Sequence, residues 1–217
     1  MTFRIPSIKS AVTALAAATG FSAPLAAQDM LPEAAPTLPA PVPLPEDAPE
    51  AAPGDAAGAE ARVDELLAQL AEAPEGLDAR IVQRIFLEWS RSGSPTVDLL
   101  LSRGQDAMEA GDPVRAAEHF TAAIDYAPDF AEAYYGRATA YYTSGLIGPA
   151  IDDLRQTLVL NPRHFLAMQG FAVLLQELGR EEDALELFSR VHEMHPANAE
   201  VTYMVEQLEQ RFGGQPL

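Results

Sequence analysis

Two histidines near the end of the chain have a spacing that could serve a metal ion. His192 and His195 are three residues apart with Glu193 between them, so their side chains would share one face of a helix. His195, however, directly precedes Pro196, which stops a helix, and no third ligand is obvious. We therefore interpret both as solvated histidines near a helix C-terminus, where the ring interacts favourably with the helix dipole, and predict no metal site.

Two short acidic runs could hold a cation. Glu181, Glu182 and Asp183 are consecutive, as are Asp152 and Asp153. Each run opens a predicted helix, where the helix dipole favours carboxylates, and we interpret both in that way. The chain has no cysteine, which excludes thiolate metal sites and cysteine nucleophiles, and it contains no phosphate-binding loop, GxSxG or HExxH motif. We predict no catalytic residue, no cofactor and no enzymatic activity.

The N-terminal segment resembles a targeting signal. Arg4 and Lys9 precede a small, apolar, uncharged run at residues 11–27. A basic start, a short apolar run and small residues at its end are typical of a secretory signal peptide, with cleavage after Ala26 or Ala27. The alternative, an uncleaved anchor, would need about 20 apolar residues to span a bilayer. We predict a signal peptide at 1–27 and, since arginine and alanine usage looks bacterial, a periplasmic protein.

The remaining chain is strongly acidic and starts with a proline-rich segment. Residues 28–217 hold 12 basic and 32 acidic residues, which argues against binding nucleic acid or an anionic membrane through charge. Residues 28–60 contain eight prolines and no basic residue, and we predict a disordered linker there. The alternative is a ligand for a proline-recognising domain.

From residue 97 onward the chain repeats itself with a period of 34 residues. Five columns of residues keep this register: a proline, a glycine, an alanine, a large apolar residue and a second small residue. Their members are Pro128, Pro162 and Pro196; Gly111, Gly145 and Gly179; Ala116, Ala150 and Ala184; Phe120, Leu154 and Phe188; and Gly104, Ala138 and Ala172. A 34-residue period with these residue types resembles the tetratricopeptide repeat (TPR) family, in repeats 97–130, 131–164 and 165–198.

The resemblance implies a mechanical role for each column. The two small residues sit where the helices of one repeat cross closely, the glycine ends the first helix, and the proline stops the second. The position usually given to leucine is Arg103 and Arg137 in the first two repeats and Phe171 in the third. We expect such an arginine to pack its stem and keep its head in water.

We therefore predict an all-α TPR solenoid of three repeats in a domain at 95–212. A polar-faced capping helix at 199–212 would close one end, followed by a short tail at 213–217. Two amphipathic helices at 61–73 and 77–92, within an N-terminal pair at 61–94, are expected to cover the first repeat. Whether this pair is a degenerate repeat stays open.

In TPR proteins the first helices of successive repeats line a concave groove that binds an extended peptide or a partner helix. The resemblance implies these lining residues here: Leu101, Gln105, Met108, Tyr135, Thr139, Tyr142, Gln169, Val173, Gln176, Tyr203 and Gln207. They mix aromatic, amide and apolar groups, which suit peptide binding. For Tyr135 and Tyr142 the alternative is packing against neighbouring helices. TPR domains that grip a chaperone's C-terminal carboxylate use basic groove residues, which are missing here.

Two functions follow as hypotheses. The first is a non-enzymatic periplasmic adaptor that binds another envelope protein, in cell-envelope assembly or maintenance. Residues 97–212 carry 19 acids and 8 arginines, so a basic or neutral partner surface is favoured. The alternative is self-association into a structural homo-oligomer, with Tyr203 and Phe212 as candidate contacts.

Overall fold

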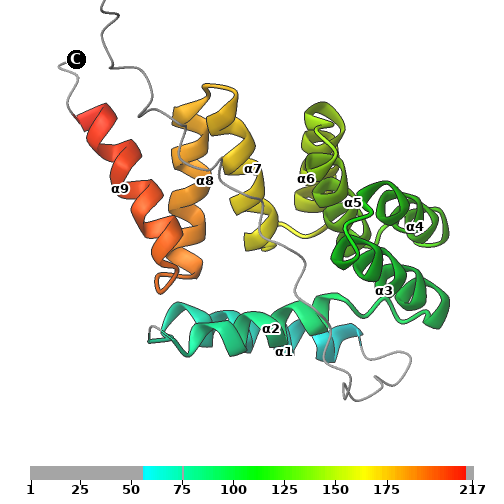
Figure 1. The fold of residues 1–217 in the computed structure, drawn as a ribbon. Helices are drawn as coiled ribbons and strands as arrows, with labels where there is room; N and C mark the ends of the chain where they lie inside the picture. Colours follow the sequence, from blue (N-terminus) through cyan, green and yellow to red (C-terminus); the bar gives the residue numbers. More distant parts are fainter. Residues whose placement is uncertain (1–55, 75, 214–217) are drawn as a thin grey trace, which may run out of the picture. The chain divides into compact units, whose positions relative to one another are not determined.

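The computed structural model describes residues 56–74 and 76–213, all within one compact unit, Pro36–Leu217. The predicted signal peptide, most of the predicted linker and residues 214–217 lie outside the described residues. The described part is all-α, which confirms the predicted fold class (Figure 1). Its helices are α1 (Ala56–Ala71), α2 (Asp78–Trp89), α3 (Pro95–Glu109), α4 (Pro113–Tyr126), α5 (Ala131–Thr143), α6 (Ile147–Leu160), α7 (Phe165–Glu177), α8 (Glu181–Met194) and α9 (Ala199–Gly213).

Helix α1 begins before the expected boundary at residue 61. It takes in Ala56 and the alanine-rich residues that follow, which had been assigned to the linker. Alanine is the strongest helix former, so once the apolar face of α1 is anchored the helix extends backward through these residues.

Helices α3 to α8 form three successive hairpins: α3 with α4, α5 with α6, and α7 with α8 (Figure 1). Gly111, Gly145 and Gly179 end the first helices with φ of +72°, +75° and +74°, a conformation that costs glycine little. The following N–H returns to the last turn of the helix, as from Asp112 to the Ala107 carbonyl at 2.9 Å. These caps reverse the chain within a few residues and bring the paired helices side by side.

Small residues let the helices of each hairpin approach closely. Ala116, Ala150 and Ala184 are fully buried, beside large buried side chains of the same helices, Phe120, Leu154 and Phe188. Ala138 and Ala172 on the first helices are also fully buried, and Gly104 is buried at the matching position of α3. The Phe120 ring fills the space at Gly104 and also at Gly136 of the next repeat, where an added Cβ would lie 2.4 and 2.6 Å from it. Phe120 thus joins two repeats.

The helices that pack between hairpins continue the stack. Helix α4 packs on α5, α6 on α7, and α8 on α9. The chain turns at the end of each second helix, where Pro128, Pro162 and Pro196 each follow directly after the helix C-cap. Helix α9 therefore covers the last hairpin, with Val201 and Leu208 buried against it.

Arg137 does not keep its head in water as expected. Its guanidinium donates to both carboxylate oxygens of Asp153 at 2.7 and 2.8 Å and to Thr121 at 3.2 Å. The guanidinium carbon also lies 5.7 Å from the ring centroids of Tyr134 and Tyr141. Asp153, on the second helix of the same repeat, lies within reach, so the bidentate pair replaces water. Arg103, by contrast, is exposed.

The α1–α2 pair lies against the third repeat, so the expectation that it covers the first repeat is wrong. Helix α1 packs on α8, and Trp89 of α2 stacks on His164 at the start of α7. Within the described residues α2 makes no packing with α3 comparable to that of α4 with α5. The apolar face of α2 instead joins the large core that contains Phe165 and Leu166.

We predict that Gly104→Ala destabilises the domain although alanine is the better helix former. The added Cβ would meet the buried Phe120 ring, and overpacking of this kind costs about 1–3 kcal/mol, against a propensity gain of about 1 kcal/mol. Urea unfolding followed by circular dichroism measures the change. Gly148→Ala is the control, because a Cβ there meets no atom within 4 Å. Equal midpoints for both variants would contradict the close crossing.

Candidate functional site

The residues expected to line the groove divide into a buried and an accessible set. The buried ones are Leu101, Gln105, Tyr135, Thr139, Gln169 and Val173. The accessible ones are Tyr203, which is exposed, and four half-buried residues: Met108, Tyr142, Gln176 and Gln207. Met108, Tyr142 and Gln176 occupy the same repeat position near the C-terminal ends of α3, α5 and α7, whereas Tyr203 and Gln207 lie on α9. The open part of this surface is therefore narrower than the sequence implied.

Tyr135 belongs to the core. Its side chain is 1% exposed, and its ring centroid lies 4.6 Å from that of His164. Burial raises the pKa of the Tyr135 phenol well above its ordinary value, and the nearby Glu132 charge adds to the rise. The expectation that Tyr135 lines an open groove is thus corrected: the start of α7 lies over its ring.

Two other buried positions of the expected groove, Gln169 and Leu101, also have partners. Gln169 accepts from Asn198 Nδ2 at 3.4 Å, and its own Nε2 donates to Glu200 at 3.4 Å. Leu101 packs with Phe120 in the core of the first repeat. The start of α9 therefore covers part of the surface that α7 was expected to present.

Tyr142 remains at the surface and links two first helices. Its hydroxyl donates to Glu177 Oε1 at the end of α7 at 2.8 Å. Partial burial, together with the hydrogen bond to this carboxylate, raises the pKa of Tyr142 to about 12. The phenol therefore stays protonated at physiological pH and presents an uncharged ring edge.

The strongest polar cluster was not anticipated from the sequence. His164 is fully buried, and its ring lies 4.6 Å from both the Trp89 and the Tyr135 rings. Its Nδ1 accepts the Ala167 N–H at 3.0 Å and so caps α7. Since a backbone N–H can only donate, the ring proton lies on Nε2, which is 2.8 Å from Glu132 Oε1. The equivalent residues in the neighbouring repeats are Phe130 and Asn198, so the residue type at this position does not repeat and the sequence contained no signal for His164.

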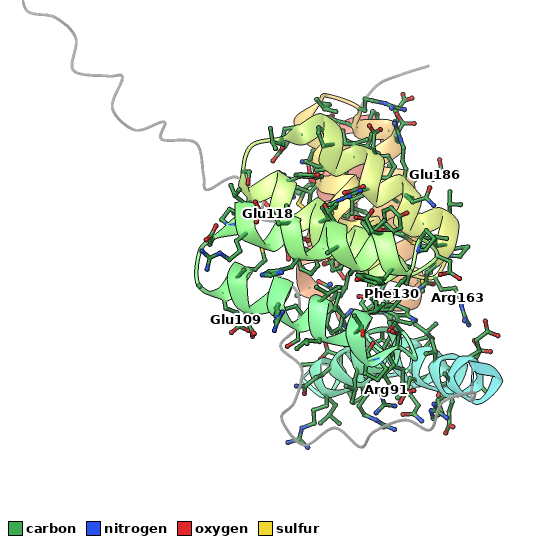
Figure 2. The ribbon with its side chains drawn as sticks, turned by 90° about the vertical axis from the view of Figure 1, so that its right-hand side faces the viewer. Arg91, Glu109, Glu118, Phe130, Arg163 and Glu186 are labelled. Atoms are coloured by element: carbon green, nitrogen blue, oxygen red, sulfur yellow. The ribbon has the colours of Figure 1, made fainter. Side chains whose placement is uncertain are left out.

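Further polar contacts attach α1 and α2 to the repeats. Arg163 forms an ion pair with Asp64 of α1, and Figure 2 shows Arg163 extending toward this helix. His195 Nε2 donates to Asp78 Oδ2 at 2.8 Å, at the first residue of α2. His195 is 5% exposed, so its interpretation as a solvated residue is wrong: α2 covers it. His192 has a separate contact, with Thr202 Oγ1 at 3.2 Å from its Nδ1.

The acidic run at the start of α8 has local partners. Asp183 accepts from Arg180 Nε at 2.7 Å, and Glu181 pairs with Arg211 of α9. Within the described residues no group of three or more His, Asp or Glu side chains is arranged to hold a metal ion. None of the helices in this part of the chain combines the length and apolarity that a membrane span requires.

Comparison with known proteins agrees with this geometry. Residues 101–162 match the tetratricopeptide repeat family. A TPR repeat-containing protein of Rhizobium etli is 31% identical over 154 residues, which are 70% of this chain and 76% of that protein. The chain belongs to the tetratricopeptide repeat family. Tetratricopeptide repeat protein 36 of Mus musculus is 34% identical over 125 residues, 56% of this chain and 63% of the mouse protein.

Solved TPR structures share the fold at lower identity. The first TPR of Spaghetti (RPAP3), solved with the HSP90 peptide SRMEEVD, has a TM-score of 0.52 and 23% identity, and covers 56% of this chain and 96% of its own. MamA has a TM-score of 0.51 and 20% identity, and covers 65% of this chain and 86% of its own. These likenesses place the chain among helical-hairpin solenoids.

We predict that Tyr135→Ala destabilises the domain severely. Removing a fully buried aromatic side chain costs about 3–5 kcal/mol, because the cavity closes only in part. Tyr142→Ala, which removes a partly exposed ring, should cost far less. Thermal unfolding followed by circular dichroism compares the two variants. An unchanged midpoint for Tyr135→Ala would contradict the burial of Tyr135 and indicate that it lies on the surface.

The Asp78–His195 contact predicts an acid-dependent loss of stability. The hydrogen bond from His195, aided by the Gly76 N–H, holds the pKa of the Asp78 carboxyl below its ordinary value of 3.8. The resulting stabilisation is present above that value and is lost as pH falls through the lowered pKa. The difference in the free energy of unfolding between the native chain and Asp78→Asn should therefore decrease as the pH is lowered from 5 to 3. Urea unfolding at both pH values tests this, and a constant difference would contradict it.

Proposed function

We propose that this chain is a non-enzymatic adaptor that binds a peptide or partner protein on the concave side of its repeats. Membership of the TPR family supports a protein-interaction role, since such domains commonly act as binding modules. The observation that carries the proposal is the accessible row formed by Met108, Tyr142 and Gln176, one from each repeat at the same position. A thioether, a phenol and an amide in line offer apolar area together with hydrogen-bonding groups.

Helix α9 extends this surface. Tyr203 is 59% exposed, and Gln207 lies one turn later on the same helix. Tyr203 also lines a shallow hollow at the α8–α9 turn with Pro196, Thr202 and Glu206. A large exposed ring beside a hollow is a suitable anchor point for a partner side chain.

The charge of the repeats narrows the partner class. Residues 97–212 carry 19 acids and 8 arginines, so a basic or neutral partner surface is favoured. The HSP90 peptide bound by the Spaghetti TPR is acidic, with two consecutive glutamates before its C-terminal Val-Asp. The groove positions of this chain offer no basic side chain to such a peptide. We therefore propose a mode of binding other than capture of a C-terminal carboxylate.

The proposed location is the bacterial periplasm. It follows from the basic start and the short apolar run before residue 28, which are typical of a secretory signal. An adaptor there would act in assembling or maintaining the cell envelope.

A capture experiment with matched variants tests the proposal. Residues 28–217 serve as bait in an envelope extract beside the double variant Tyr142→Ala/Gln176→Ala. The control is Tyr126→Ala, which removes a tyrosine that is 71% exposed on α4, away from the row. We expect a protein retained by the native chain and the control but lost by the double variant. With that protein purified, its affinity should fall about 30-fold, as for loss of a contact worth about 2 kcal/mol.

Circular dichroism first establishes that all three baits are folded. Equal retention by all three would show that the partner does not bind at the row formed by Met108, Tyr142 and Gln176. A bait that retains only itself would instead favour the alternative of self-association.

A further inference from the structure

The α1–α2 pair covers the N-terminal half of the surface on which the proposed function rests. Glu132 lies one turn before Tyr135 on the same face of α5, and Phe165 and Leu166 lie at the start of α7. All four are buried, although groove positions near the C-terminal ends of the same helices stay accessible. The rings of Trp89 and Tyr135 both contact His164, so α2 reaches this half of the face.

The contact has the composition of an amphipathic helix seated in a binding site. Helix α2 contributes Ile85 and Phe86, which are fully or almost fully buried, and Trp89, which stacks on His164 and lies 5.6 Å from the Phe165 ring. Acidic side chains flank these apolar groups and meet basic groups of the repeats: Asp78 contacts His195, and Asp64 contacts Arg163. An aromatic anchor with acids at its margins is a recognisable helix-in-groove pattern.

Two buried polar atoms at the contact of α2 with the repeats, Ser90 Oγ and His195 Nδ1, have no hydrogen-bond partner in the described part of the chain. Among the described residues, the buried polar atoms without an aligned hydrogen-bond partner are Ser90 Oγ, both carboxylate oxygens of Glu132, His164 Nε2, His195 Nδ1 and Gln176 Oε1. Ser90 is the C-cap of α2 and His195 contacts Asp78 of α2, whereas Glu132 and His164 belong to the repeats, where Glu132 Oε1 lies 2.8 Å from His164 Nε2. Buried polar groups left unpaired lower the stability of the contact that buries them, so Ser90 Oγ and His195 Nδ1 weaken the attachment of α2 to the repeats.

We propose that α1–α2 is a displaceable cover over a docking site for an amphipathic helix of the partner protein. The fitting helix carries an aromatic residue within an apolar stripe, for the His164–Phe165 surface, and an acidic residue for Arg163 or His195. This inference deepens the proposed function and rests on it. The pair is tied to the repeats by the short segment 90–94, so it competes with the partner at a high effective concentration. The partner's apparent affinity is therefore reduced by the fraction of chains that are closed.

The chain provides its own reporter for opening of the cover. Trp89 is its single tryptophan, so selectively excited tryptophan fluorescence reports on the contacts of Trp89 with His164 and Phe165. In a urea titration of the full chain, we expect the Trp89 signal to change at lower urea than the helical circular dichroism signal. Coincident transitions would show that α1–α2 is an integral part of the cooperative core and would overturn the proposal.

A cross-linked variant tests the docking site directly. Because the chain has no cysteine, Asp64→Cys/Arg163→Cys supplies the two reactive thiols, at side chains that are 62% and 43% exposed in the native chain. A short bis-maleimide locks the cover shut, whereas N-ethylmaleimide caps the same thiols and leaves it able to open. The probe is a fluorescein-labelled peptide with the sequence of residues 78–92, measured by fluorescence anisotropy.

We expect the capped protein to bind this peptide and the locked protein to bind it at least about tenfold more weakly. A peptide with Trp89→Ala should bind the capped protein at least about tenfold more weakly than the native peptide. Equal binding by locked and capped proteins, or no loss with the altered peptide, would overturn the proposal. Neither measurement uses the Met108–Tyr142–Gln176 row or an envelope extract, so failure here is distinct from failure of the proposed adaptor function.

Discussion

The close crossing of two helices within each hairpin is the constraint on which the rest of this structure depends. An apolar ring such as Phe120 can fill the space between helices only if Gly104 and Gly136 leave it room. Once α3, α4 and α5 are held at this distance, the next hairpin can stack in the same way. Because each repeat buries its apolar face only against a neighbour, the small residues determine the spacing of every later helix.

The face formed by the first helices of the hairpins has an accessible part and a part that is covered by other residues. Near the C-terminal ends of α3, α5 and α7 the surface stays open, and Met108, Tyr142 and Gln176 are accessible there. Near the start of α7, His164 gathers Trp89, Tyr135 and Glu132 into a buried cluster beneath α2. The same hairpin geometry thus supports an accessible row and a covered site, and the difference between them is the α1–α2 pair.

The polar contacts around this pair show how a helix can be held without a well-formed core. Asp64 in the middle of α1 pairs with Arg163, and Asp78 at the start of α2 contacts His195, while Ser90 Oγ and His195 Nδ1 are buried without a hydrogen-bond partner among the residues that the structure describes. Ion pairs that are partly exposed contribute little stability, so the apolar contact of Ile85, Phe86 and Trp89 must supply most of it. The proposed cover requires this attachment to be less stable than the repeat cores.

The sequence by itself determined the repeat period, the family, the hairpins and the cap, because small residues, glycines and prolines act on the backbone within a few residues of where they stand. It also predicted a set of groove-lining residues on the first helices, of which Tyr135 and Gln169 are among those that are buried. Only the tertiary structure decided which of those residues stay open, since Tyr135 is buried by His164 at the start of α7. His195 is buried in the same way by Asp78 of α2, which lies far from it in the sequence. The tertiary structure likewise decided the pairing of Arg137 with Asp153, because it depends on how closely α5 and α6 approach each other. Repeat columns describe what every unit shares, whereas Trp89 and His164 occur once, and a single pair leaves no periodic signal.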